Sequence, residues 1–500
     1  MTMMRLKRGV LAAAFLAAAL TLGGCTTNPA TGGRDFTPFM SPAQERQVGR
    51  QQHPQVVAQF GGAQEDPELQ AYVERIGQGL AAASELPDLD FTFTVLDTDT
   101  VNAFAIPGGY VYVTRGLVAL ANDEAELAGV IGHEIGHVTA RHSAQRQTQS
   151  VFAQLGQFGL TVLGAVFGGQ TGAQLGSQVG GLGGLAYVQS YSREQEFEAD
   201  RLGVRYLTGA GYDPAAMASF LRTLDRDTAL RQRLAGGGAA QARDASLFAS
   251  HPRTMDRVER AIAEVEGATP GEGRRGRDEL LARVDGMLYG EDPGQGLVRD
   301  GAFVHPDLRF AFDIPRGFRV QNTPRAVLAQ GPRGDIMVFD GATAPPGRSV
   351  RDYLVRDWAG RASLRDVQTL RVDGMDAAAA ATVVQAGGRR AEALLVAIRH
   401  GGERIYRFAF ASPDGISRDD LRTYNAAVAS FRRLSAEQAG AIRPRRLQVV
   451  TVRPGETARD LAGRMAVDRR LAEEQFRVLN GLGPDEEVQP GQRVKLVVVG

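Results

Sequence analysis

The run His133-Glu134-Ile135-Gly136-His137 constrains this chain more than any other stretch of its sequence. Residues four apart on an α-helix lie on one face, so His133 and His137 can direct imidazole nitrogens at a single metal ion. Glu134 lies beside them, close enough to act as a base on a water molecule without ligating the metal. Two surface histidines on an ordinary helix are the alternative. The spacing favours a zinc site on a buried helix.

The residues around the motif predict a long helix with a crowded face. The segment 122–126 (Asn-Asp-Glu-Ala-Glu) supplies a helix-capping candidate and acidic residues for a first turn. Gly132 and Gly136 each cost about 1 kcal/mol inside a helix relative to alanine. We therefore expect another backbone or a substrate to approach the helix closely at these two positions.

A catalytic zinc usually has three protein ligands, and candidates for the third lie in the acidic segment 191–200, which opens a second helix. Glu194, Glu196, Glu198 and Asp200 all carry suitable carboxylates. Glu196 and Asp200 are four apart, so one could bind the metal while the other accepts the N–H of a ligating histidine. The simpler alternative is an acidic helix N-terminus favoured by the helix dipole. Residue chemistry alone leaves the choice among the four open.

The order and form of these two segments resemble a family of zinc metalloendopeptidases. The family includes the CAAX prenyl protease, the heat-shock protease HtpX and the periplasmic lipoproteases BepA and LoiP. In it, the helix with His-Glu-x-x-His is followed by a segment of the form Ser-Arg-x-x-Glu-x-x-Ala-Asp. Residues 192–200 match that form position by position.

The resemblance implies a role for each residue of the two segments. It implies one zinc ion per chain, with the ligands His133, His137 and Glu196. Asp200 would be the carboxylate partner of a ligating histidine, and Glu134 the general base. Glu194 and Glu198 fall outside the family pattern. The implied fold is a mainly helical, gluzincin-type metalloprotease domain with a small β-hairpin edge, over residues 41–266.

A third stretch, residues 101–117, carries the resemblance further. It reads as a β-hairpin, because alternating apolar runs flank Pro107-Gly108-Gly109. In the family, this hairpin provides an edge strand along which an extended peptide can lie. The resemblance thus implies substrate contacts at Asn102, Ala103 and Phe104. A purely structural hairpin is the alternative.

A fourth match is the pair His251 and Arg257, which fits the family's His-Pro-x-x-x-x-Arg element. The resemblance places both residues near the metal. They could stabilise the oxyanion of the tetrahedral intermediate, or His251 could cap the open zinc position as an inhibitory ligand. The sequence does not decide between assistance and inhibition.

The first residues of the chain predict export and lipidation. Residues 1–24 read as a signal peptide, with a basic start and an apolar run too short to span a bilayer. Leu22-Gly23-Gly24-Cys25 has the form of a bacterial lipobox, and Cys25 is the only cysteine. Because Thr26 follows it rather than aspartate, we expect a lipid anchor in the outer membrane and a tether over 25–40 in the periplasm. An ordinary secreted protein with one thiol is the alternative.

The rest of the chain divides by composition into an α+β multidomain arrangement, in which 500 residues imply about three domains. A linker is expected over 267–300 and an α+β domain of unassigned role over 301–437. Its histidines, His305 and His400, are expected to be structural or on the surface. The formal net charge of zero argues against nucleic acid as a partner.

Two further segments leave alternatives open. Residues 445–500 read as a separate β-α-α-β module that resembles a LysM domain, which implies binding to peptidoglycan; a small cap without glycan affinity is the alternative. Residues 147–192 contain no charged side chain. They could form a lid over the site, a surface for membrane or unfolded clients, or a buried hairpin.

These features predict a lipid-anchored periplasmic zinc endopeptidase that cleaves misassembled envelope proteins. The rival hypothesis is a wall-bound holding chaperone whose protease site is latent or capped by His251. Glu134 favours the enzyme, because a binding protein has no evident need for a general base.

Overall fold

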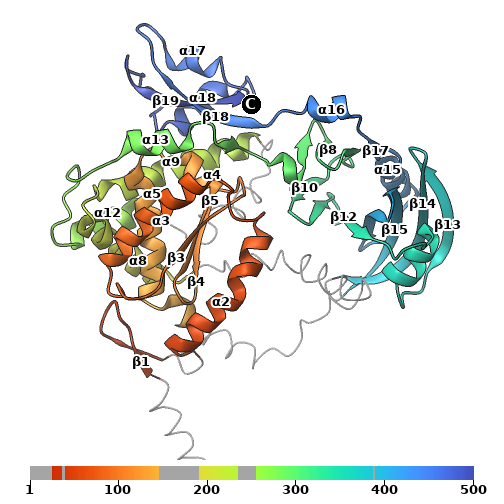
Figure 1. Cartoon of the computed structure of the whole chain (residues 1–500), viewed down its shortest axis with the longest axis horizontal. Coiled ribbons are helices and arrows are strands. Elements are labelled where there is room, and N and C mark those ends of the chain that lie inside the picture. Colours follow the sequence, from red (N-terminus) through yellow and green to blue (C-terminus); the bar gives the residue numbers. More distant parts are fainter. Residues whose placement is uncertain (1–24, 37–39, 146–190, 235–254, 387–388) are drawn as a thin grey trace, which may run out of the picture.

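The computed structural model describes residues 25–36, 40–145, 191–234, 255–386 and 389–500. The expected signal peptide, nearly all of the uncharged segment 147–192 and His251 lie outside these ranges. In Figure 1, a mainly helical body lies on the left with the C-terminal module above it, and a sheet-rich domain lies on the right. Within the described ranges, no helix is both long enough and apolar enough to cross a membrane.

The helical body surrounds a small three-stranded sheet. The strand order is β3-β5-β4, with β3 parallel and β4 antiparallel to β5, so β4 is an edge strand. Strands β4 and β5 form the hairpin predicted over 101–117. The elements are α2 (Pro42–Gln59), α3 (Pro67–Ala82), β3 (Thr92–Leu96), β4 (Ala103–Ile106), β5 (Tyr110–Thr114), α4 (Arg115–Leu120), α5 (Glu124–Thr139), α8 (Arg193–Gly209), α9 (Ala215–Leu234) and α12 (Met255–Glu264).

Two segments expected to be flexible connections have regular structure. Within 25–40, β1 (Cys25–Thr27) pairs antiparallel with β2 (Arg34–Phe36), and the Asn28 side-chain amide donates to the Ala140 carbonyl at 3.3 Å. Within 267–300, α13 (Arg277–Val284) buries Leu280, Leu281 and Val284 in the helical body. The glycine- and proline-rich composition ends at Gly276, and an amphipathic helix follows it.

The C-terminal module has the expected β-α-α-β order, but it is not separate from the helical body. Its elements are β18 (Arg445–Thr451), α17 (Ala458–Ala462), α18 (Ala472–Leu479) and β19 (Arg493–Val499). The short strand β6 (Leu288–Tyr289), which follows α13, completes its sheet in the order β19-β18-β6. Buried side chains of the module and of the helical body form one continuous core. We call this combined body the protease unit, meaning residues 40–289 and 445–499.

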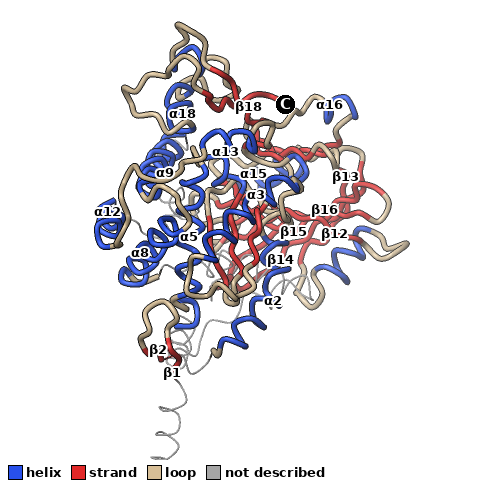
Figure 2. The backbone as a smooth tube through the Cα atoms, turned by 60° about the vertical axis from the view of Figure 1, so that its left-hand side comes forward, coloured by secondary structure: helices blue, strands red, loops and turns tan. Residues whose placement is uncertain are grey.

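The α+β domain, which lies between β6 and β18 in the sequence, has two antiparallel sheets and cores of its own. One sheet has the order β10-β11-β12-β16-β15-β14-β13 and the other β17-β9-β8-β7; Figure 2 shows the larger sheet as red strands at the right. The strands and helices are β7 (Leu297–Arg299), β8 (Ala302–His305), β9 (Phe310–Asp313), β10 (Arg319–Asn322), β11 (Ala326–Gln330), β12 (Ile336–Thr343), α14 (Val350–Asp352), η4 (Tyr353–Trp358), β13 (Arg365–Val372), β14 (Met375–Ala386), β15 (Arg389–Gly401), β16 (Arg404–Ser412), α15 (Arg418–Ala429), β17 (Arg432–Arg433) and α16 (Ala436–Gly440).

Candidate metal centre

The motif helix α5 and the second helix α8 cross at small residues. A Cβ added at Gly136 would lie 3.0 Å from the Ala199 carbonyl oxygen of α8, and one added at Gly203 would lie 3.0 Å from the His133 backbone nitrogen. Gly132 faces Gly203 in the same way. The predicted close approach at Gly132 and Gly136 is therefore confirmed, and the neighbour is the backbone of α8. This contact lets side chains of both helices reach one point.

Local hydrogen bonds fix where both helices begin. The Asp123 carboxylate accepts from the Glu126 N–H at 2.8 Å at the start of α5, and Arg275 pairs with Asp123 at 2.8 Å. Ser192 caps α8 through a reciprocal capping box with Gln195. Such caps satisfy backbone N–H groups that a helix start leaves without partners. The register of the ligand-bearing turns is thereby set.

His133, His137 and Glu196 meet at a buried point between the two helices. One ligand atom from each lies within 4.8 Å of the others. The two Nε2 atoms are 3.0 Å apart, and the Glu196 carboxylate oxygens lie 3.7 Å from the Nε2 of His133 and 3.6 Å from that of His137. All three residues are at most 1% exposed.

These distances fit a tetrahedral zinc ion. Ligands about 2.1 Å from such an ion lie roughly 3.4 Å from one another, close to the three separations above. The donor set of two imidazoles and one carboxylate is also typical of zinc sites that keep one position open. The three residues present are therefore able to hold the metal that the sequence predicts.

Asp200 and Arg257 lie immediately behind these ligands. An Asp200 carboxylate oxygen is 2.9 Å from His133 Nδ1, the nitrogen that points away from the ligand cluster. Arg257, from α12, donates to Asp200 through Nε at 2.5 Å and lies 3.2 Å from Glu196. Asp200 and Arg257 thus lie beside the candidate ligands, and Arg257 contacts carboxylates on two successive turns of α8.

A second chain of side chains, which the sequence argument missed, reaches His137. The Nδ1 atoms of His137 and His142 are 2.8 Å apart, and His142 Nε2 is 3.0 Å from a Glu198 carboxylate oxygen. His142 is fully buried. The Tyr191 ring stacks on His137 with centroids 3.9 Å apart. Glu198, which the family pattern left out, is therefore linked to a ligand through one histidine.

His142 reaches the site because the chain turns sharply after α5. Arg141 has a φ of 56°, in the left-handed region that favours glycine. Its guanidinium pairs with Glu45 at 3.1 Å and donates to the Met40 carbonyl at 2.8 Å. These contacts hold a non-glycine residue in that conformation. The signal available in the sequence was the His142 that closes the motif run, but its position depends on this turn.

The remaining predicted site residues lie as follows. Glu134 is 1% exposed and occupies the position after His133 on α5. Asn102 precedes the edge strand β4, in which Ala103 and Phe104 are buried. Glu194, at the start of α8, is exposed.

Two histidines from one helix, a glutamate from a second helix and the buried Glu134 beside them define a metallopeptidase of the His-Glu-x-x-His class. Residues 67–265 match the model of peptidase family M48. The family suggested by the sequence motifs is therefore confirmed.

Curated relatives share part of their length with this chain. The beta-barrel assembly-enhancing protease of Yersinia pestis is 34% identical over 235 residues, which are 45% of this chain and 45% of that protein. The mitochondrial metalloendopeptidase OMA1 of Arabidopsis thaliana is 32% identical over 150 residues, which are 30% and 29% of the two chains. The metalloprotease LoiP of Escherichia coli (strain K12) is 30% identical over 159 residues, 32% of this chain and 56% of that protein. The chain thus spans 29–56% of the length of these relatives.

Among solved structures, cyanobacterial PsbP (CyanoP) from Synechocystis sp. PCC 6803 matches 29% of this chain and 98% of its own, at 14% identity and a TM-score of 0.21. A match at this TM-score does not establish a shared fold.

Proposed function

We propose that this protein is a zinc-dependent endopeptidase that hydrolyses peptide bonds in misassembled envelope proteins. The observation that carries the proposal is the convergence of His133, His137 and Glu196 on one buried point inside an M48 peptidase domain. The names of the relatives, a beta-barrel assembly-enhancing protease among them, support envelope proteins as the substrate class.

The chemistry divides between the metal and Glu134. Zinc, when bound, would supply a Lewis acid that polarises the scissile carbonyl. Glu134 would take a proton from the attacking water and deliver it to the leaving amine. Glu134 follows His133 directly and is almost completely buried, and both features suit this role. A carboxylate that is shielded from bulk water exchanges its proton with the reactants and not with the solvent.

The carboxylates behind the ligands would fix the orientation of both imidazoles. A histidine that binds zinc through Nε2 carries its hydrogen on Nδ1. His133 would then donate to Asp200. His137 would donate to His142, and His142 would in turn donate from its Nε2–H to Glu198. Each of the two histidines thus has a carboxylate at the end of its hydrogen-bond chain. The donor and acceptor atoms in these chains are 2.8–3.0 Å apart.

The edge strand β4 would bind the substrate as an extra strand. Among the strands that the structure describes, it pairs only with β5. An extended peptide added to its other side would gain backbone hydrogen bonds, with the chain held near Asn102, Ala103 and Phe104. Arg257 would hold Glu196 and Asp200 in place. His251 would either assist at the oxyanion or cap the metal, and both roles remain part of the proposal.

The location proposed for the enzyme follows from its two ends. Lipidation of Cys25 would anchor it in the outer membrane, facing the periplasm. Residues 445–500 would bind peptidoglycan and raise the concentration of enzyme near the wall. Because this module shares its core with the protease domain, glycan binding is best measured on the whole chain. Retention by sacculi that N-acetylglucosamine oligomers compete away would support wall binding, whereas retention without competition would contradict it.

The central experiment measures zinc content and casein cleavage of the purified chain. We expect one zinc per chain and cleavage that falls by about 10³-fold in Glu134→Gln. Greater cleavage by His251→Ala than by the native chain would assign inhibition to His251, and weaker cleavage would assign assistance. Zinc binding without cleavage in any variant would contradict the enzyme and favour the holding chaperone. Absence of zinc would overturn the site itself.

A further inference from the structure

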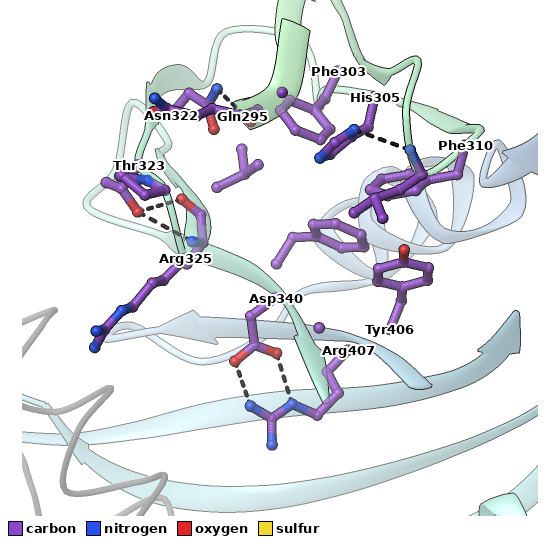
Figure 3. A pocket seen from close by; sticks show the side chains of 17 residues that line it. Gln295, Phe303, His305, Phe310, Asn322, Thr323, Arg325, Asp340, Tyr406 and Arg407 are labelled. Atoms are coloured by element: carbon purple, nitrogen blue, oxygen red, sulfur yellow. Dashed lines mark hydrogen bonds and ion pairs between the residues drawn. The ribbon is translucent and has the colours of Figure 1, made fainter. Parts of the chain in front are cut away.

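A cavity of about 400 Å³ opens between the two sheets of the α+β domain, outside residues 67–265 that match the peptidase family (Figure 3). Strands β8, β9, β11, β12 and β16 contribute to its walls, with the turn between β10 and β11 and the short 3-10 helix η3 (Pro293–Gln295). Cavities of roughly 300–1,000 Å³ with apolar walls and a few placed polar groups are typical of small-ligand sites. The peptidase chemistry proposed above makes no use of it.

Aromatic rings form much of the apolar wall. Phe303, Phe310, Phe339 and Tyr406 are each at most 3% exposed. The Phe310 centroid lies 4.4 Å from that of Tyr406 and 5.5 Å from that of Phe339. Ring pairs in offset or edge-to-face geometry attract one another beyond the effect of buried area alone. A wall of this kind favours an aromatic guest over an aliphatic one.

His305 gives this wall a hydrogen-bond donor. The residue is 8% exposed, and its ring lies 5.5 Å from that of Phe310. Its Nδ1 accepts the Leu308 N–H at 3.3 Å, so the neutral ring carries its hydrogen on Nε2. Burial also lowers the pKa of His305, which favours the neutral form. The Nε2–H is then available to a ligand.

Asn322 lies beside the cavity, and its side chain is held in place by the backbone. Its amide nitrogen donates to the Gln295 and Gly296 carbonyls at 3.0 and 2.8 Å, which fixes the orientation of the side chain. Its Oδ1 is buried, and within the described part of the chain it has no hydrogen-bond partner. A buried acceptor without a partner is costly in a folded protein.

The charged residues at the cavity do not make it a site for ions. Asp340 and Arg407 pair with each other, and Figure 3 shows this pair directed away from the aromatic rings. On that opposite face of the sheet, Arg407 lies over the Trp358 ring at 5.1 Å and contacts the Tyr353 hydroxyl at 3.3 Å. Arg325, at the rim, is exposed. The interior is therefore neutral.

We propose that this cavity binds a neutral aromatic group that bears one hydroxyl or amide, with the ring against Phe303, Phe310 and Phe339. The polar group accepts from His305 Nε2–H. Such a group could come from a free phenol-like molecule or from an aromatic side chain of a polypeptide. The chemistry is the same for both sources, and the probes below separate them.

The test uses the whole chain carrying Glu134→Gln, so that peptide probes stay intact and the result does not depend on proteolysis. Binding of 4-fluorophenol is followed by fluorine NMR, with 4-fluorotoluene as a probe that has the ring but no hydroxyl. We expect saturable binding of 4-fluorophenol, tighter than that of 4-fluorotoluene. No saturable binding of either probe would overturn the proposal.

A cavity-filling variant locates the binding. Gly341 lies two residues after Phe339 on β12, on the same side of the strand. A Cβ there would lie 3.4 Å from the Tyr406 ring, an ordinary contact, so Gly341→Leu fills the cavity without backbone strain. Gly401→Leu, at the exposed end of β15 with nothing within 4 Å of its Cβ, is the matched control. At least tenfold weaker binding in the first variant alone is expected; equal binding in both would contradict the site.

The variant His305→Phe tests the polar contact. It keeps a ring among the aromatic side chains and removes the N–H donor. Binding of 4-fluorophenol should weaken about 3- to 10-fold, the effect of one neutral hydrogen bond, while 4-fluorotoluene binding stays unchanged. Equal losses for both probes would contradict a hydrogen bond from His305. Binding of N-acetyl-L-tyrosinamide as tight as that of 4-fluorophenol would identify a polypeptide side chain as an acceptable source, and its exclusion would identify a free small molecule.

Discussion

The candidate metal site of the protease unit and the cavity of the α+β domain differ in the charge that they bury. In the protease unit, Glu134, Glu196 and Asp200 are all nearly inaccessible, and Arg257 supplies one positive charge beside them. Burying carboxylates is expensive unless cations compensate them, so this site is suited to a divalent ion. In the α+β domain, the cavity interior is neutral and aromatic, and its charged pair points to the other face of the sheet.

This difference decides how visible each site is in the sequence. Buried carboxylates and histidines at helical spacing are rare, so the pattern at 133–137 is informative by itself. Phe303, Phe310 and Phe339 look like ordinary core residues until the two sheets are seen to leave a space between them. The comparison predicts that perturbations of the metal site should leave the α+β domain unaffected, and the experiments below test this in order of expected effect.

The largest effect should follow removal of the general base. Glu134→Gln keeps the shape of the side chain but cannot accept a proton, so casein cleavage should fall by about 10³-fold, within the range attributed to general acid–base catalysis. Zinc content and 4-fluorophenol binding should stay unchanged. The control is Glu194→Gln, on the exposed start of α8, which should cleave normally. Cleavage that survives Glu134→Gln would remove Glu134 from its assigned role.

The next largest effect should follow zinc removal, which should affect the protease unit and not the α+β domain. A ligand present at 1,000 times its Kd stabilises the folded state by about 4 kcal/mol, and here that stabilisation acts on α5 and α8. Treatment with a chelator should therefore increase amide hydrogen exchange in these helices and lower the Tm of the protease unit. Amide hydrogen exchange in β15 and β16 should not change, because these strands belong to the cores of the α+β domain. Equal increases in both regions would show that the chain unfolds as one unit.

Sequence reasoning reached the parts of the site that depend on spacing. His133, His137, Glu196 and Asp200 lie on predicted helix faces, α5 begins within the capping segment 122–126, and α8 begins within the segment 191–200 that was expected to open a helix. The glycine contact was also foreseeable, because glycine inside a helix needs a reason. The apolar runs at 336–339, 393–398 and 404–410, which favour strands, lie within β12, β15 and β16, whereas the run at 308–312 begins two residues before β9.

What escaped prediction depends on tertiary contacts. His142 joins the site through a left-handed Arg141, a conformation held by Glu45 and the Met40 carbonyl, which lie about a hundred residues earlier. One of the connections between the C-terminal module and the protease domain is β6, a strand of two residues. A strand this short leaves no alternation of apolar and polar residues to detect. The orphaned Asn322 oxygen likewise exists only once the sheets have packed.

The His142 chain gives a prediction of intermediate size. His142→Ala removes the partner of His137 Nδ1, and loss of such partners usually weakens metal affinity 10- to 100-fold. The zinc Kd, measured by competition with a chromogenic chelator, should rise by that factor, and the visible spectrum of the cobalt-substituted protein should change. Glu198→Gln should act in the same direction but less strongly, whereas Glu194→Gln should have no effect. An unchanged zinc Kd in His142→Ala would show that His142 only packs against His137 and does not affect metal binding.

The smallest effect concerns the join between the C-terminal module and the protease domain. Lys495, on β19, is fully buried and donates to the Ala119 and Ala121 carbonyls, at 2.8 and 2.6 Å, just before α5. Burial lowers its pKa from 10.5 to about 7, with Arg277 adding to this effect and Glu126 and Asp123 opposing it. Between these two values, the unfolded chain binds a proton that the folded chain does not. Stability should therefore rise with pH, by up to about 1.4 kcal/mol per unit.

Urea unfolding at pH 7.5, 8.5 and 9.5 measures this slope, and Lys495→Met should remove it. Arg493→Met, two residues earlier on the same strand, removes another basic side chain and should keep the slope. If both variants retain it, the proton belongs to another group. If the native chain shows no slope, Lys495 stays protonated in the folded state, and the carbonyls that end α4 hold an ammonium ion. In that case the protease unit stabilises buried charge of both signs, and its contrast with the neutral cavity of the α+β domain becomes sharper.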